Sequence, residues 1–163
     1  MLAESLILVE FVADLFPQSS LLPADPVLRA RARFFIDQCT KITTNFQGII
    51  PRGEMDGLFP GIRALQQLLP AEGNGPYIIG DTFTIADIAI APLVGLLSVA
   101  LENDVGAFAE GEGRKAFNTI QTDAQYASFK RYVEAIQDRE SFKTTCKPVR
   151  CHVYFVLICS GTT

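Results

Sequence analysis

The chain has 163 residues, of which 48% are hydrophobic and 20% charged, a balance typical of one soluble globular domain. A chain of this length buries roughly 68–70% of its unfolded surface on folding. Its formal net charge of −4 and isoelectric point of about 5.0 exclude a nucleic-acid surface, which needs a clustered excess of Lys and Arg, but leave a local site for an acidic metabolite open.

The first predicted element is a short amphipathic helix over residues 4–16. Apolar residues recur along it at helical spacing, at Leu8, Val12, Leu15 and Phe16. Its start carries Glu4 and Ser5, where free backbone N–H groups and the positive end of the helix dipole suit a carboxylate. The Ser hydroxyl adds a donor and the Glu carboxylate can hold an ammonium, so the pair has the chemistry to grip an α-amino acid group. The alternative is an ordinary polar helix start, which is the commoner meaning of this pattern.

An irregular linker, residues 18–24, separates this helix from a long one. Asp25 and Pro26 supply an N-cap followed by Pro at the first helical position, which is a favoured helix start. One apolar stripe follows, at Leu28, Ala32, Phe35, Cys39, Ile42 and Phe46. Because Cys39 lies on this stripe, it is predicted to be a core thiol rather than a reactive one.

Arg29, Arg33 and Asp37 line another face of the long helix at i, i+4 spacing. Residues so placed can pair with one another along a solvated face, each pair contributing a few tenths of a kcal/mol. The functional alternative is a basic row that faces an acidic tripeptide.

A third helix is predicted from about Glu54 or Met55 to Leu69, after a break over residues 48–57 that contains Pro51 and two glycines in its second half. Its apolar stripe consists of Leu58, Ile62, Leu65 and Leu69. Pro70 ends it, and a loop over residues 71–80 follows, in which Tyr77-Ile78-Ile79 are expected to tuck against the bundle. The glycines of this loop lack the spacing of a phosphate-binding loop.

The core of the fold is predicted to be the helix that begins after Thr84. Thr84 as N-cap and Asp87 three residues later form a capping box, and Phe83 with Ile88 forms a hydrophobic staple. From Ile85 to Leu101 almost every side chain is apolar, so this helix should be buried on all sides by other helices. Pro92 is expected to kink it, which the surrounding packing would tolerate.

Residues 102–113 are predicted to be a loop, and a final helix is expected over residues 123–138. After Lys143 the chain changes character. Cys146, Cys151, His152 and Cys159 gather around an apolar run over residues 153–158. The C-x4-C-H-x6-C spacing is not typical of structural zinc sites, so no metal site is predicted. An added strand, a sticky helix or a tail of abnormal origin are the alternatives, and the tail is expected to add nothing to the fold.

The cellular compartment is predicted from what the chain lacks. Four cysteines are too few for a disulfide scaffold in a chain of this size. Glu4, Glu10 and Asp14 interrupt the first apolar stretch, which argues against a signal peptide, and no segment is expected to reach the run of about 18 apolar residues that spans a membrane. The default is therefore a reducing, cytoplasmic compartment.

Four motifs in one order resemble the glutathione S-transferases, most closely the omega-type or fungal members. Gly80-Asp81-Thr82-Phe83-Thr84-Ile85-Ala86-Asp87 resembles the turn and cap of the core helix in the family's C-terminal domain. Glu4-Ser5 resembles the family's glutathione-contacting pair. Leu22-Pro23-Ala24-Asp25-Pro26 with Arg29-Ala30 resembles its interdomain junction, and Arg139 with Ser141-Phe142 resembles the end of its last helix. Together the motifs cover about residues 2–143.

The resemblance implies an all-α fold, a glutathione S-transferase C-terminal-like bundle of about five or six helices preceded by a remnant helix of a thioredoxin-like domain. Residues 1–17 would be that remnant, the last helix of the glutathione-binding domain, and residues 18–24 the linker. Residues 25–143 would be the helical domain and residues 144–163 an atypical Cys-rich apolar tail. Without the sheet on which the first helix packs in the family, several of its large side chains should be exposed unless another chain covers them.

The resemblance also implies glutathione as cosubstrate, in conjugation or thiol transfer to small hydrophobic electrophiles. Glu4 and Ser5 would bind the γ-glutamyl end of glutathione, as an ancestral role rather than a working site in this chain. The family's catalytic Cys, Ser or Tyr has no counterpart position, and His152, the sole histidine, lies in the tail. No catalytic residue is therefore assigned, and the chain is expected to be truncated and inactive by itself.

The alternative is a non-catalytic helical module for protein–protein interaction or hydrophobic ligand binding. Neither nucleic acid nor a membrane is an expected partner, and a homodimer stays open.

Overall fold

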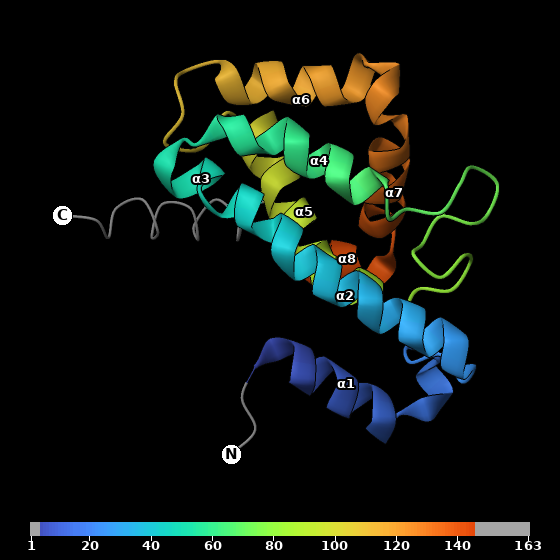
Figure 1. The fold of residues 1–163 in the computed structure, drawn as a ribbon. Coiled ribbons are helices and arrows are strands. Elements are labelled where there is room, and N and C mark those ends of the chain that lie inside the picture. The colour runs from blue at the N-terminus through green and yellow to red at the C-terminus, as the bar shows by residue number, and fades with distance from the viewer. Residues whose placement is uncertain (1–3, 146–163) are drawn as a thin grey trace.

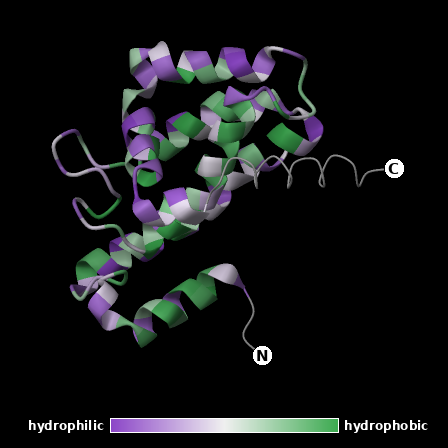
Figure 2. Cartoon of the chain, turned by 180° about the vertical axis from the view of Figure 1, so that it is seen from behind, coloured by the Kyte–Doolittle hydropathy of each residue, from purple (hydrophilic) through white to green (hydrophobic). Residues whose placement is uncertain are grey.

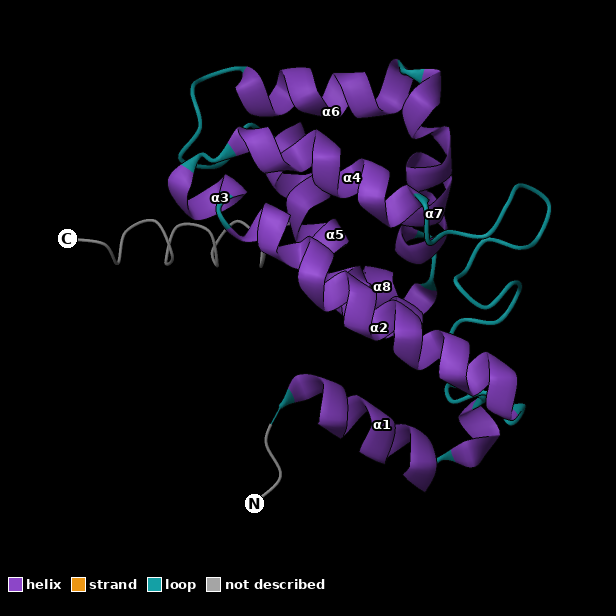
Figure 3. Cartoon of the chain, in the orientation of Figure 1, coloured by secondary structure: helices purple, strands orange, loops and turns teal. Residues whose placement is uncertain are grey.

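The computed structural model of the protein describes residues 4–145. Its helices in chain order are α1 (Ser5–Leu15), α2 (Pro26–Gln47), α3 (Ile49–Arg52), α4 (Leu58–Gln66), α5 (Ile85–Glu102), α6 (Glu112–Thr122), α7 (Ala127–Gln137) and α8 (Glu140–Thr145). Backbone pairing of the strand type is limited, within this part of the chain, to two isolated bridges, Tyr77 with Gly80 and Ile79 with Thr82. The predicted all-α fold is therefore confirmed (Figure 3).

Helix α5 is the centre of the bundle, and it packs against α1, α2, α6 and α7 (Figure 1). Its buried side chains cover most of the helix circumference and include Ile85, Ile90, Val94, Leu97 and Leu101. On the remaining side Pro92 is exposed, and Ile88 and Leu96 are only partly buried. The predicted core helix is thus confirmed, because a helix this apolar can leave water only when other helices cover it. The expected burial on all sides is not reached, since the side of Pro92 stays exposed.

Among the helices in residues 4–145, α5 is the one that is long and apolar enough to cross a membrane, judged by length and composition alone. Its mean hydropathy is 1.9 over 18 residues. Asp87 and Glu102 lie within this window, so it is not an unbroken run of about 18 apolar residues, and the expectation about such a run is not contradicted. More than half of that window, 56%, is buried inside the bundle. The apolar composition of α5 is accounted for by the other helices that cover it.

The start of α5 is built as the sequence predicts. Thr84 has an extended backbone, its hydroxyl accepts from the N–H of Ala86, and the Thr84 N–H donates to Asp87 Oδ2 at 2.9 Å. Two backbone N–H groups that the helix itself cannot satisfy therefore find partners, which confirms the capping box. The start of α2 is confirmed in the same way, because Asp25 Oδ1 accepts from the N–H groups of Val27 and Leu28.

Helix α6 has no counterpart among the predicted elements. It is mostly polar, and the positions it buries are Gly113, Ala116 and Ile120. Three small or medium side chains at helical spacing are a weak apolar stripe, so the periodicity did not stand out. The packing of α6 across α5 and α7 compensates for what the sequence pattern lacks.

Two predicted helix ends are also corrected. The third helix ends at Gln66 instead of Leu69, since Pro70 disfavours helical geometry in the residue before it. The final helix begins as a 3-10 turn at Ala124–Tyr126 and becomes an α-helix only at Ala127.

The predicted pairing of Arg29, Arg33 and Asp37 along α2 is wrong. Arg33 binds Glu10 of α1 through two hydrogen bonds, of 2.8 and 3.1 Å. Asp37 instead accepts from Lys41, and Arg29 Nε donates to the carbonyl of Pro23. Helix α1 lies beside α2 (Figure 1) and presents a carboxylate that a guanidinium can bind with two parallel bonds, which is a better partner than a neighbour on the same helix.

The predictions for the Cys-rich tail, including those for Cys146, Cys151, His152 and Cys159, lie outside the described residues. Within them, Ile78 and Ile79 are buried against the bundle, as predicted for the loop before α5.

Candidate functional site

Glu4 and Ser5 lie at the free end of α1, and both side chains are exposed. Glu4 is the residue before the helix, and its side chain makes no capping hydrogen bond. Its φ of 73° lies in the left-handed region that residues with a side chain rarely adopt. The first-turn N–H groups of α1 are those that no preceding turn can satisfy. This end of the helix therefore presents a carboxylate, a hydroxyl and backbone donors to any ligand that reaches it.

Helix α1 lies at one edge of the molecule, beside α2 and far from α6 (Figure 1). Its inner side buries Ala13, with Val9 partly buried next to it. The predicted apolar stripe is exposed to solvent. Figure 2 shows the hydrophobic colour along this helix. Six large apolar side chains of the helix and its end are 39–56% exposed: Ile7, Leu8, Phe11, Val12, Leu15 and Phe16. This confirms the expected exposure and defines a surface that we call the α1 face.

A large apolar pocket lies between the start of α5 and α8, with a volume of about 670 Å³. Its walls are Leu21, Phe83, Ile88, Ala91, Pro92, Leu96, Ile136, Arg139, Ser141, Phe142 and Thr145. Phe83 and Ile88, predicted as a staple, therefore both line this pocket. Sequence reasoning did not find the pocket, because it is formed by residues up to 124 positions apart, from Leu21 to Thr145.

Arg139 is the cationic group of this pocket. Its guanidinium carbon lies 3.7 Å from the centre of the Phe83 ring, a cation–π contact, and 5.6 Å from the centre of the Tyr77 ring. Its Nη1 donates to the Tyr77 hydroxyl at 3.5 Å, while Nε is buried without a hydrogen-bond partner among the described residues. The resemblance to the family had singled out Arg139 only as a mark of the last helix.

Within residues 4–145 the chain has one cysteine, Cys39, and its side chain is 3% exposed. Burial, with a smaller contribution from the charge of Asp87, raises the pKa of Cys39 to about 12. A thiol in this state is almost wholly protonated at neutral pH and cannot act as a nucleophile. The prediction that Cys39 is a core thiol is confirmed.

Residues 47–135 match the family model described as the C-terminal domain of glutathione S-transferase. The chain belongs to the glutathione S-transferase family. This match includes the capping box of α5 and ends within α7.

Solved structures agree with the family and its class. The chain is similar to glutathione transferase Omega 1C of Trametes versicolor, with 40% identity and a TM-score of 0.87 over 98% of this chain. It is also similar to Omega 2S of the same organism, solved in complex with 2,4-dihydroxybenzophenone, with 33% identity and a TM-score of 0.83 over 94% of this chain. The expected likeness to omega-type and fungal members is thereby confirmed.

Among curated proteins, a probable glutathione S-transferase of Nicotiana tabacum is 28% identical over 86% of this chain. The chain spans 60% of that tobacco protein and 66% of either crystallised Omega transferase. The relatives therefore contain about a third or more of their length outside the matched region.

Proposed function

We propose that this chain is the helical part of an omega-like glutathione S-transferase, which acts on small hydrophobic electrophiles with glutathione as cosubstrate. The α1 face carries this proposal. A helix that exposes five large apolar side chains, with Phe16 directly after it, is unfavourable in water, and Glu4 and Ser5 lie at its start. A thioredoxin-like domain packed on the α1 face would cover those side chains and place its glutathione site beside the pair.

Within that site Glu4 and Ser5 would hold the γ-glutamyl end of glutathione. The Glu4 carboxylate suits the ammonium, and the Ser5 hydroxyl with the N–H groups of the first turn suits the carboxylate. Both side chains are exposed, so neither has to leave the protein core to bind. This assignment of residues 1–17 to the glutathione-binding domain rests on the family resemblance and the exposure of α1.

By itself the chain should have no measurable turnover. The chemistry needs the glutathione sulfur held close to a thiolate, by a positioned donor or a low-pKa cysteine. Cys39 is buried with a pKa of about 12, and Glu4 and Ser5 would contact the opposite end of the tripeptide. We expect the protein to be cytoplasmic, with no nucleic-acid or membrane partner.

The test is an assay of the purified chain with glutathione and a general electrophile, beside calorimetric titration of glutathione. A chimera that carries the N-terminal third of Omega 1C in front of this chain should gain turnover, and Ser5→Ala should reduce it. The matched control is Ser19→Ala, at an exposed serine of the turn after α1, which should leave the chimera unchanged. Saturable turnover by the chain alone that is lost in Ser5→Ala would refute the proposal.

The alternative is that the α1 face serves a non-catalytic module and binds a protein, including a second copy of this chain. Exposed apolar surface of this extent favours association in either case. Sedimentation of the chain and of a Phe11→Ser, Leu15→Ser double variant would decide whether the face makes a homodimer. A dimer that the double variant dissociates, together with a chimera that gains no turnover, would favour the module.

A further inference from the structure

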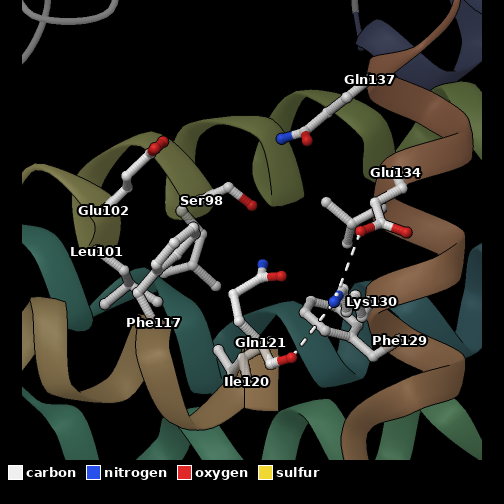
Figure 4. A pocket seen from close by; sticks show the side chains of 12 residues that line it. Ser98, Leu101, Glu102, Phe117, Ile120, Gln121, Phe129, Lys130, Glu134 and Gln137 are labelled. Atoms are coloured by element: carbon white, nitrogen blue, oxygen red, sulfur yellow. Dashed lines mark hydrogen bonds and ion pairs between the residues drawn. The ribbon is translucent and has the colours of Figure 1, made fainter.

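A second pocket lies among α5, α6 and α7, and it shares no residue with the pocket beside Arg139. Its volume is about 190 Å³ (Figure 4). Six apolar side chains form its floor: Leu97, Leu101, Phe117, Ile120, Phe129 and Val133. No residue of α1 lines it, so it lies apart from the proposed glutathione site. We call it the α5–α6–α7 pocket.

The floor of this pocket is preformed. Five of its six side chains are at most 7% exposed, and Phe117 is partly buried against the same core. Side chains packed in this way sit in fixed rotamers, so a ligand need not organise them. A cavity of about 150 Å³ lined by Leu, Ile and Phe accommodates one benzene molecule. The α5–α6–α7 pocket therefore has room for a single ring.

Three uncharged polar side chains surround the mouth, one from each helix: Ser98, Gln121 and Gln137. In Figure 4 the Ser98 hydroxyl and both amide groups are turned toward the space between the helices. None of these three side chains makes a hydrogen bond within residues 4–145, although each is partly buried. Ser98 is also the sole polar residue in the run from Ile88 to Leu101, where an apolar side chain would suit a purely structural helix.

The charged residues at the mouth are already engaged or turned away. Lys130 Nζ donates to the backbone carbonyl of Gln121 at 3.3 Å and lies 3.9 Å from the carboxylate of Glu134. The carboxylate of Glu102 points away from the pocket in Figure 4. An ionised ligand would therefore find no free counter-charge, whereas a neutral hydroxyl would find both donors and acceptors.

We propose that the α5–α6–α7 pocket binds small neutral phenols, with the ring on the apolar floor and the hydroxyl bonded to the amide of Gln121, beside Ser98 and Gln137. A phenol is neutral at pH 7, because its pKa is near 10. Its ring matches the pocket volume, and its hydroxyl can form a hydrogen bond to a polar group at the mouth, which an unsubstituted ring cannot do. This site is independent of the proposed glutathione chemistry.

The test is a fluorine NMR titration of the full 163-residue chain with 4-fluorophenol, with fluorobenzene and 4-fluorobenzoate as comparison ligands. We expect saturable binding of 4-fluorophenol in the millimolar range, which suits a ligand of this size, and at least about tenfold weaker binding of the benzoate. Gln121→Leu should weaken 4-fluorophenol by about three- to tenfold, the value of one hydrogen bond, and leave fluorobenzene unaffected.

Two further variants locate the ligand. Ser98→Phe places a ring in the mouth and should abolish binding, whereas Ala91→Leu occupies the pocket beside Arg139 and should leave it unchanged. Circular dichroism would confirm that each variant folds. If Ser98→Phe does not fold, the Gln121→Leu variant, at the partly exposed rim of the pocket, decides whether the ligand binds there. Absence of saturable binding, equal binding of the benzoate, loss of binding in Ala91→Leu, or unchanged binding in Gln121→Leu would each overturn the proposal.

Discussion

The hydroxyl of Tyr132 on α7 donates to Oδ1 of Asp87 on α5 at 3.2 Å, across 45 positions of sequence. The same oxygen accepts from the N–H of Ile78, and Oδ2 accepts from the N–H and the hydroxyl of Thr84. Asp87 is fully buried, so these four donors replace the water that its carboxylate loses. One side chain thus joins the loop before α5, the start of α5 and α7.

Asp87→Ala should lower the free energy of unfolding by about 2–5 kcal/mol. Loss of the cap accounts for about 0.5–2 kcal/mol, and each buried donor left without an acceptor adds about 1–3 kcal/mol unless water reaches it. The urea midpoint of wild type and variant measures the difference. Asp81→Ala, at an exposed position of the same turn, is the control and should change little. An unchanged midpoint in Asp87→Ala would show that the carboxylate is not bonded as described.

Tyr132→Phe should cost about 1.5–3 kcal/mol, because it removes one hydrogen bond to the buried Asp87 carboxylate and keeps the ring. Tyr126→Phe is a matched control, since Tyr126 is equally buried but its hydroxyl only accepts a long bond of 3.4 Å from Arg63. The control should cost less than half as much in the same urea titration. If both variants lost the same free energy of unfolding, the hydrogen bond from Tyr132 to Asp87 would contribute no more to stability than the long bond at Tyr126.

The stability contribution of Asp87 should depend on pH. Burial raises the pKa of Asp87 above its ordinary value of 3.8, although its four donors act in the opposite direction. The folded state therefore holds this proton more tightly than the unfolded state. The contribution of Asp87 to the free energy of unfolding is then largest below pH 3.8 and falls as pH rises through the raised pKa.

Asp87→Asn isolates this effect, because all other titrating groups are shared with the wild type. The difference in free energy of unfolding, wild type minus variant, should fall as pH rises from about 3 and become flat above the raised pKa. Urea titrations at successive pH values measure it. A difference that grows with pH would mean that the folded state favours the ionised carboxylate.

Cys39 should resist alkylation in the folded protein, since it is 3% exposed and burial raises its pKa to about 12. Mass spectrometry of peptides after treatment with iodoacetamide at about pH 8 measures its labelling separately from the other cysteines. The same treatment in urea is the control and should label Cys39 fully. Rapid labelling without urea would place this thiol outside the core.

Local interactions are what the sequence by itself determined. The caps at Asp25 and Thr84, the apolar stripe of α2 with Cys39 on it, and the apolar length of α5 all depend on residues within a few positions of one another. Such contacts form in any context that permits a helix, so spacing alone predicts them. The family motifs are likewise short and ordered, which is why the all-α fold could be predicted.

Tertiary structure alone decided which distant groups meet. Arg33 binds Glu10 rather than its helical neighbour Asp37, because α1 lies beside α2 in the folded chain (Figure 1). Helix α6 has only a weak apolar stripe, and it is stabilised because Ala116 and Ile120 are buried where α6 packs against α5 and α7. The Tyr132 hydroxyl on α7 reaches Asp87 on α5, and no periodicity in the sequence relates these two helices. The same holds for the pocket at which three helices bring together Ser98, Gln121 and Gln137. Side-chain contacts between helices depend on crossing angles and packing, which are set by the whole core rather than by any one segment.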